Sequence, residues 1–189
     1  MILPIIAYGS PVLKKRAVEI KSDYPNLQQL IQDMFDTMYA AKGVGLAAPQ
    51  VDASIRLLII DATIYSDEFP ETIDFKKVMI NPEIIEETGD EWAFNEGCLS
   101  VPDIREDVWR KPCIKITYQD ENFNTFTEVY KGMVARVVQH EYDHLEGKLF
   151  VEKVSNIRKI LLKRKLTDIT FGNIKVDYRM KFPLRKKSR

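Results

Sequence analysis

Residues 132–146 read Gly-Met-Val-Ala-Arg-Val-Val-Gln-His-Glu-Tyr-Asp-His-Leu-Glu, and this stretch decides the fold. Its apolar residues recur at helical spacing, a glycine precedes them and another follows, so the pattern predicts a helix. Residues four apart share one face of a helix, so His140 and His144 continue the apolar face of Met133 and Val137. Both imidazoles are therefore expected to point into the protein.

His140 and His144 are the only histidines in the chain. Two imidazoles on one helical face can bind one metal ion, and the adjacent Glu141 could exchange a proton with water at that metal. The alternative is a chance pair on an amphipathic helix. Buried imidazoles need polar partners, however, and a metal satisfies both of them at once. The motif H-E-x-x-H therefore predicts a catalytic metal site.

A catalytic metal of this kind takes three protein ligands and leaves one position for water. The motif and the residues after it fit the metzincin pattern H-E-x-x-H-x-x-G-x-x-H until Phe150, which stands where the last histidine should be. After Glu152 the next acidic residue is Asp168, so the third ligand is expected upstream of the helix. Cys98 and Cys113 are the cysteines available there.

The two cysteines differ in their surroundings. Cys98 lies in a run with a glycine and a proline, which indicate loop-like backbone and suit a metal ligand. Cys113 begins an alternating run that predicts a half-buried strand, where a cysteine serves as a small apolar residue. A disulfide between them is not expected, because nothing in the sequence points to an oxidising compartment.

Three runs of the chain resemble the peptide deformylase family. They are Gly43-Val44-Gly45-Leu46-Ala47-Ala48-Pro49-Gln50, Glu96-Gly97-Cys98-Leu99-Ser100 and Gln139-His140-Glu141-Tyr142-Asp143-His144. These are similar to that family's G-x-G-L-A-A-x-Q, E-G-C-L-S and Q-H-E-x-D-H, in the family's order and with family-like spacing. The resemblance covers residues 2–154. It implies a metal-dependent hydrolase that removes the formyl group from the N-terminal formylmethionine of newly made proteins and releases formate.

The resemblance also implies roles for single residues. The residues that would bind the metal, with water as the fourth ligand, are Cys98, His140 and His144. Glu141 would take a proton from that water and return it to the leaving amine. The side-chain amide of Gln50 and the backbone N–H of Leu99 would stabilise the oxyanion. The family's usual metal is Fe²⁺, with Zn²⁺, Ni²⁺ and Co²⁺ able to substitute, and a thiolate with two imidazoles suits all four.

Substrate contacts follow from the same resemblance. The glycine-containing run 43–50 would pair with the peptide backbone like an added strand. The residues expected to contact or shape the substrate site are Gly43, Val44, Gly45, Glu96, Gly97, Arg105, Met133 and Val137. Among them, Val44, Met133 and Val137 would line a pocket for the methionine side chain. Glu96 could hold the metal-site loop through hydrogen bonds, and Asp143 would orient a ligand histidine. Arg136 occupies a position that is commonly apolar in the family, where it could face solvent or alter the edge of the pocket.

The rest of the chain predicts an α+β fold, because strand-like segments cluster instead of alternating strictly with helices. Besides 132–146, helices are predicted at 26–42 and 155–165. Strands are predicted at 55–61, 77–80, 83–87, 113–119 and 125–130, with a turn at 120–124 and a polar surface insertion at 61–74. The family fold agrees, with antiparallel or mixed β-sheets around a central helix that carries H-E-x-x-H.

The 189 residues, 45% hydrophobic and 30% charged, indicate one globular domain, which we place at 1–165 before a basic arm at 166–189. Residues 1–152 hold 15 Lys+Arg and 26 Asp+Glu, whereas 153–189 hold 13 and 2. This arm could contact the ribosome, or it could pack on the acidic body. Residues 174–182 alternate between apolar and polar side chains, so part of the arm could be a strand. No apolar run is long enough to span a membrane and the start lacks a signal peptide, so a cytoplasmic location is expected.

Two other functions compete with this interpretation. A metallopeptidase would carry its third histidine or glutamate downstream of the motif. The sequence has no further histidine there, and Glu146 and Glu152 lie too close to the motif to reach back easily. A ribosome- or RNA-binding module with a structural metal would need four protein ligands, and only three good candidates exist. Replacing Cys98 by serine separates these functions: loss of both metal and activity would support the deformylase, whereas retained activity would rule out Cys98 as a ligand.

Overall fold

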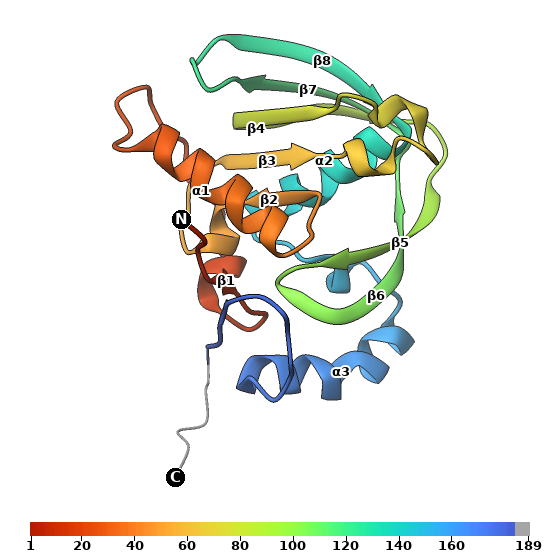
Figure 1. The fold of residues 1–189 in the computed structure, drawn as a ribbon. Coiled ribbons are helices and arrows are strands. Elements are labelled where there is room, and N and C mark those ends of the chain that lie inside the picture. Colours follow the sequence, from red (N-terminus) through yellow and green to blue (C-terminus); the bar gives the residue numbers. More distant parts are fainter. Residues whose placement is uncertain (184–189) are drawn as a thin grey trace.

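The structure, a computed structural model, describes residues 1–183 and folds them around the predicted central helix (Figure 1). The helices are α1 (Leu27–Ala40), α2 (Gly132–Leu145) and α3 (Asn156–Phe171). The strands are β1 (Ile5–Ile6), β2 (Gly45–Ala47), β3 (Leu57–Asp61), β4 (Lys76–Thr88), β5 (Trp92–Cys98), β6 (Val101–Arg110), β7 (Cys113–Gln119), β8 (Thr125–Lys131) and β9 (Met180–Lys181). The predicted α+β class is confirmed.

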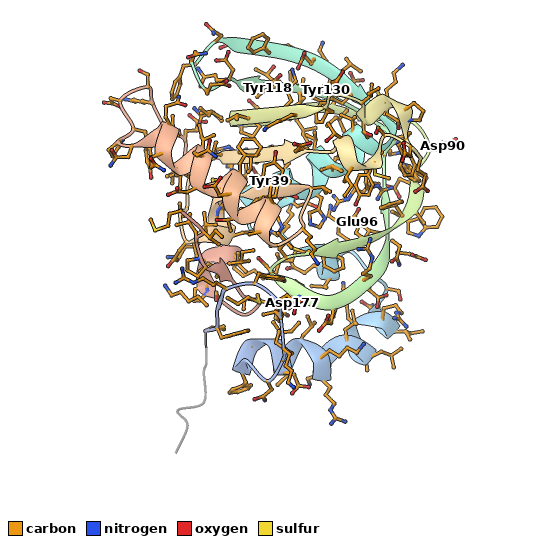
Figure 2. The ribbon with its side chains drawn as sticks, in the orientation of Figure 1. Tyr39, Asp90, Glu96, Tyr118, Tyr130 and Asp177 are labelled. Carbon is orange, nitrogen blue, oxygen red and sulfur yellow. The ribbon has the colours of Figure 1, made fainter. Side chains whose placement is uncertain are left out.

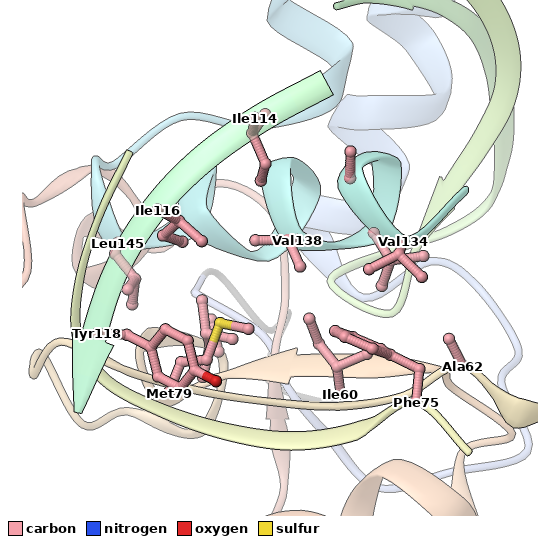
Figure 3. Packing of buried hydrophobic residues seen from close by; sticks show 14 of the residues in the cluster. Ile60, Ala62, Phe75, Met79, Ile114, Ile116, Tyr118, Val134, Val138 and Leu145 are labelled. Carbon is pink, nitrogen blue, oxygen red and sulfur yellow. The ribbon is translucent and has the colours of Figure 1, made fainter. Parts of the chain in front are cut away.

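The largest sheet has the antiparallel order β2-β3-β4-β7-β8, with α1 and α2 on its two faces. Strand β3 explains this arrangement, because its apolar run is buried on both faces. Leu58 and Ile60 pack in the cluster that contains residues of α2 (Figure 3), whereas Leu57 and Ile59 pack in the cluster that contains residues of α1. The central helix is thus covered by a sheet along its apolar face.

The first turn of α2 is capped from a distant segment. Lys131, at the N-cap, provides no side-chain hydrogen bond to the helix. Instead the carboxylate of Glu71 accepts the backbone N–H of Met133 at 2.9 Å. A carboxylate is favourable there, because the first N–H groups of a helix lack partners and the dipole is positive at that end. The segment 61–74, predicted as a surface insertion, therefore also supports the start of the metal-site helix.

Strands β5 and β6 form a separate antiparallel hairpin beside α2, and α3 packs along its other side (Figure 1). After α3, which ends at Gly172 in the left-handed conformation, the chain returns to pair β9 with β1 in parallel. The molecule therefore places α2 between the five-stranded sheet and the hairpin.

Several boundaries differ from the sequence prediction. The segments 77–80 and 83–87 form one strand, β4, with an irregular register between Ile80 and Glu83 where Pro82 has no N–H to donate. The sequence prediction also missed β2, β5 and β6. The prediction of loop-like backbone around Cys98 was wrong, because Cys98 is the last residue of β5. The pairing of β5 with β6 is irregular there, with a bulge between Gly97 and Cys98.

The C-terminal boundary also falls differently. Helix α3 continues to Phe171, so the proposed domain limit at 165 lies inside this helix. The division into a catalytic domain and a basic arm stays a prediction, and residues 184–189 of that arm lie outside the described part of the chain. None of the described helices combines the length and apolarity that crossing a bilayer requires.

Candidate active site

The structure brings the three predicted metal ligands together. The ligand atoms of Cys98, His140 and His144 all lie within 4.8 Å of one another, and Cys98 Sγ is 3.3 Å from His144 Nε2. The histidines come from one face of α2 and the cysteine from the tip of the β5–β6 hairpin. One thiolate and two imidazoles form a donor set for a transition metal or zinc. These residues fit a catalytic metal that keeps one coordination position open.

Glu96 controls the orientation of His140. Its Oε2 lies 2.8 Å from His140 Nδ1, which leaves Nε2 to face the metal site. Arg110 binds both oxygens of Glu96, at 2.7 and 2.9 Å, and Arg136 binds Oε1 at 2.9 Å. Burial opposes ionisation of Glu96, but the hydrogen bonds with His140 and Arg110 hold its pKa well below the usual range. The carboxylate therefore stays charged at the centre of the molecule (Figure 2).

Asp143 does not orient a ligand histidine, in contrast to the prediction. Its Oδ2 accepts a hydrogen bond from Arg110 at 2.6 Å and lies 3.2 Å from Lys153 Nζ. Arg110 thus bridges Asp143, on the metal-site helix, to Glu96, on the hairpin. The acidic residue that contacts a ligand histidine is Glu96, and Asp143 is linked to Glu96 through Arg110.

Arg136, whose position the sequence left open between solvent and the pocket edge, is 2% exposed. Its guanidinium donates to Glu96, to the carbonyl of Val108 at 2.8 Å and to the carbonyl of Trp92 at 2.6 Å. It also lies over the ring of Trp92, 4.4 Å from the centroid. Arg136 therefore joins α2 to both strands of the hairpin.

Glu141 lies against β2. A Cβ atom built on Gly45 would come within 2.4 Å of Glu141 Oε1, so only glycine allows this carboxylate its present position. Glu141 Oε2 is buried without a hydrogen-bond partner in the described chain. Burial raises the pKa of Glu141 to about 7. An unpartnered carboxyl group with such a pKa is suited to accept and return a proton near neutral pH.

The side chain of Gln50 is held in place by a hydrogen bond within its own turn. Its Oε1 accepts the backbone N–H of Ala47 at 2.8 Å, so its amide nitrogen must point the other way. That nitrogen lies 3.5 Å from Cys98 Sγ and 3.2 Å from Ser100 Oγ. The side chain is 2% exposed. Gln50 therefore presents an uncharged donor to the space beside the metal ligands.

A cavity of about 480 Å³ opens at this site. The predicted residues that line it are Gly43, Val44, Gly45, Gln50, Glu96, Gly97, Cys98, Leu99, Arg105, Met133, Val137, His140 and Glu141. His144 is buried behind them, 1% exposed. Of the cavity residues that the prediction missed, Tyr178 comes from the C-terminal segment, where only an alternating strand-like pattern was visible in the sequence.

Comparison with known proteins identifies the family. The sequence profile of the family described as polypeptide deformylase matches residues 2–160. The chain belongs to the peptide deformylase family. A peptide deformylase of Christiangramia forsetii is 57% identical over 196 residues, which span 100% of both chains. As a peptide deformylase, the chain is a metal-dependent hydrolase that removes the N-terminal formyl group from nascent peptides.

Solved deformylase structures agree with this fold. The peptide deformylase of Legionella pneumophila has a TM-score of 0.78 at 40% identity and covers 89% of this chain and 95% of its own. A Met-Ala-Ser-bound class I type b peptide deformylase of Acinetobacter baumannii has a TM-score of 0.74 at 38% identity, covering 82% and 99%. The profile match ends at residue 160, so most of α3 and all that follows it lie beyond the family's matched region.

Proposed function

We propose that this deformylase binds its metal through Cys98, His140 and His144, uses Glu141 as proton acceptor and donor, and stabilises the oxyanion with Gln50 and Leu99. The observation that carries the proposal is the meeting of all these residues on or directly behind one cavity wall, from three separate segments of the chain. A bound metal would supply Lewis-acid polarisation and a more acidic water.

The protein residues account for the remaining steps. Glu141, whose Oε2 has no hydrogen-bond partner among residues 1–183, is free to take the proton from the attacking water and deliver it to the leaving amine. The amide of Gln50 donates to the oxygen of the formyl group as negative charge develops there. An uncharged donor held in place before the reaction needs no rearrangement in the transition state.

Formate release from formyl-Met-Ala-Ser tests these roles. Glu141→Gln keeps the shape of the side chain, and we expect it to lower kcat by about 10²- to 10⁴-fold while the metal content stays at the wild-type level. Cys98→Ser should lose metal and activity together. Glu141→Gln with wild-type kcat, or Cys98→Ser with full metal and activity, would refute the assignment.

For substrate binding, we infer that the peptide backbone pairs with the open side of β2. This strand is at the edge of its sheet, and the described chain pairs it only with β3. Val44, Met133 and Val137 would hold the methionine side chain, since all three line the cavity and offer apolar surface. The Acinetobacter baumannii relative was solved with Met-Ala-Ser bound, which is the expected product of the formylated peptide.

We also propose Fe²⁺ as the resident metal, with Zn²⁺, Ni²⁺ or Co²⁺ able to replace it, because the donor set suits each of them. An iron–thiolate site is sensitive to oxygen. Protein purified without oxygen should therefore contain iron and lose activity in air, whereas the Ni²⁺-loaded protein should keep its activity. Equal stability in air of iron- and nickel-loaded samples would contradict iron as the oxygen-sensitive component.

The basic C-terminal arm suggests a partner. We propose that residues 166–189 contact the ribosome, where nascent substrates emerge, and that the protein acts in the cytoplasm. The support is charge, since residues 153–189 carry 13 Lys+Arg and 2 Asp+Glu. Replacing Arg185, Lys186, Lys187 and Arg189 by glutamine should weaken co-sedimentation with ribosomes at low salt. Unchanged co-sedimentation would exclude a contact through these charges.

A further inference from the structure

The tip of the β5–β6 hairpin is an unusual turn. Cys98 pairs with Val101, so Leu99 and Ser100 form a two-residue connection. Tight hairpins of this length favour turns with positive φ, because such turns match the twist of the strands. Neither Leu99 nor Ser100 has a positive φ. The turn therefore lacks the backbone conformation that would stabilise it locally.

The tip is also separated from the rest of its hairpin. Gly97 pairs with Arg105 while the next residue, Cys98, pairs with Val101, so three residues of β6 bulge out between them. Asp103, within this bulge, has a φ of 58°. Bulges interrupt the ladder and redirect the strand. The segment that carries a metal ligand and the proposed oxyanion donor thus depends on contacts from outside the hairpin.

Among residues 1–183, three hydrogen bonds from outside the hairpin reach the two turn residues, Leu99 and Ser100. The backbone N–H of Tyr8 donates to the carbonyl of Ser100 at 2.8 Å, and the amide of Gln50 donates to the hydroxyl of Ser100 at 3.2 Å. The hydroxyl of Tyr178 donates to the carbonyl of Leu99 at 2.7 Å. Of the three, only the Tyr178 bond acts on Leu99 itself.

Tyr178 belongs to residues 173–181, which we call the C-terminal strap. The strap is held at its far end, where β9 pairs with β1 and the carbonyl of Arg179 accepts the N–H of Ile5 at 2.8 Å. Met180 adds packing in the cluster formed by the hairpin and α3. Figure 2 shows Asp177 of the strap beside the hairpin, on the side of α3.

The strap also borders the cavity directly, since Lys175, Val176, Asp177 and Tyr178 line it. Burial and the neighbouring Cys98 raise the pKa of Tyr178, so its hydroxyl remains a donor. The strap lies beyond residue 160, where the family profile ends. This wall of the cavity is therefore formed by residues outside the region that the family profile matches.

We propose that Tyr178 is a positioning residue for deformylation, which holds Leu99 so that its N–H is directed at the developing oxyanion. This inference rests on the proposed role of Leu99. Losing one neutral hydrogen bond should weaken a contact that matters in the transition state and leave ground-state binding largely intact. The effect should therefore fall on kcat more than on KM.

The test compares Tyr178→Phe with Tyr118→Phe. Both remove one tyrosine hydroxyl, but Tyr118 donates to Glu128 in the five-stranded sheet, far from the strap in Figure 2. With formyl-Met-Ala-Ser, Tyr178→Phe should lower kcat by about 3- to 10-fold, with KM changed by less than about 2-fold and metal content unchanged. Tyr118→Phe should keep the wild-type kcat.

Hydrogen–deuterium exchange provides a readout that does not depend on turnover. In Tyr178→Phe, backbone exchange should increase in a peptide covering residues 97–101 and stay unchanged in one covering 113–119. Wild-type kcat and exchange in Tyr178→Phe would overturn the proposal. A fall in kcat that is fully explained by a matching loss of metal would also overturn the proposal, because Tyr178 would then only stabilise the metal site. Failure of the proposed function itself would appear differently, as an inactive wild-type protein with full metal.

Discussion

At the scale of single residues, the site depends on how closely β2 approaches Glu141. Gly45 is not required for an unusual φ, since it is not among the residues with positive φ. It is required for space, because any side chain at this position would overlap the carboxylate of Glu141. This contact therefore restricts the position to glycine, next to the carboxylate that we propose to transfer the proton.

Gly45→Ala should therefore separate activity from stability. The added methyl group must displace Glu141, and a misplacement of about 1 Å can cost on the order of 10²-fold in rate. We expect kcat/KM for formyl-Met-Ala-Ser to fall by about 100-fold. Gly97→Ala is the comparison, since its Cβ would meet the end of the Arg105 side chain at 3.1 Å, which can move aside. Equal losses in both variants would contradict this explanation.

Arg136 acts at the same scale but on stability. Removing its side chain takes one hydrogen-bond donor from Glu96 and also removes the donor to the carbonyl groups of Val108 and Trp92. Arg136→Met should lower the free energy of unfolding by about 2–3 kcal/mol in urea titrations. Arg105 is an exposed arginine of the same hairpin, so Arg105→Met should change stability by about 0.5 kcal/mol or less. Similar losses of unfolding free energy in the two variants would indicate that the buried hydrogen bonds of Arg136 stabilise the protein no more than the exposed ones of Arg105.

At the scale of elements, the metal-site helix depends on a segment outside it. Glu71 caps the first turn of α2, and Gly132 leaves room for it, since a Cβ there would lie 2.3 Å from Glu71 Oε1. The helix therefore begins where a carboxylate from the segment after β3 meets its free N–H groups.

Glu71→Ala should cost about 1 kcal/mol of stability, the usual effect of losing a helix cap. Urea unfolding monitored by circular dichroism would measure it. Glu68→Ala is the matched control, because Glu68 is an exposed glutamate of the same segment. Indistinguishable midpoints for the two variants would show that the cap has no energetic role.

At the scale of the whole molecule, the proposed metal ligands come from two structural units. Cys98 lies on the hairpin, whereas His140 and His144 lie on α2. An ion bound by both units favours the folded state, because the unfolded chain cannot present the three ligands together. The site should therefore couple metal binding to global stability.

Chelation should lower the melting temperature in calorimetry, and adding metal back should restore it. With free metal at 1,000 times the dissociation constant, the stabilisation is about 4 kcal/mol. In Cys98→Ser the chelator should have much less effect. Equal melting temperatures for loaded and chelated wild-type protein would show that the metal does not link the two units.

Periodicity and motifs in the sequence were sufficient to predict the features that depend only on residues close together along the chain. The helical spacing of His140 and His144 predicted α2, and alternation with a turn at Asp120 predicted β7 and β8. The α+β class and the deformylase family were predicted correctly from such patterns. These features are local, so a few consecutive residues encode them.

Only the tertiary structure decided the contacts that hold the site in place. Glu96 serves two arginines and His140, Glu71 reaches α2 across 62 positions, and Tyr178 reaches Leu99 across 79. The hairpin that carries Cys98 was missed for the same reason, since its tip is held by contacts from outside. The sequence alone predicted which residues would perform the chemistry, because each motif is a short run of neighbouring residues. Their positions depend on buried polar pairs, which form only when distant segments fold together.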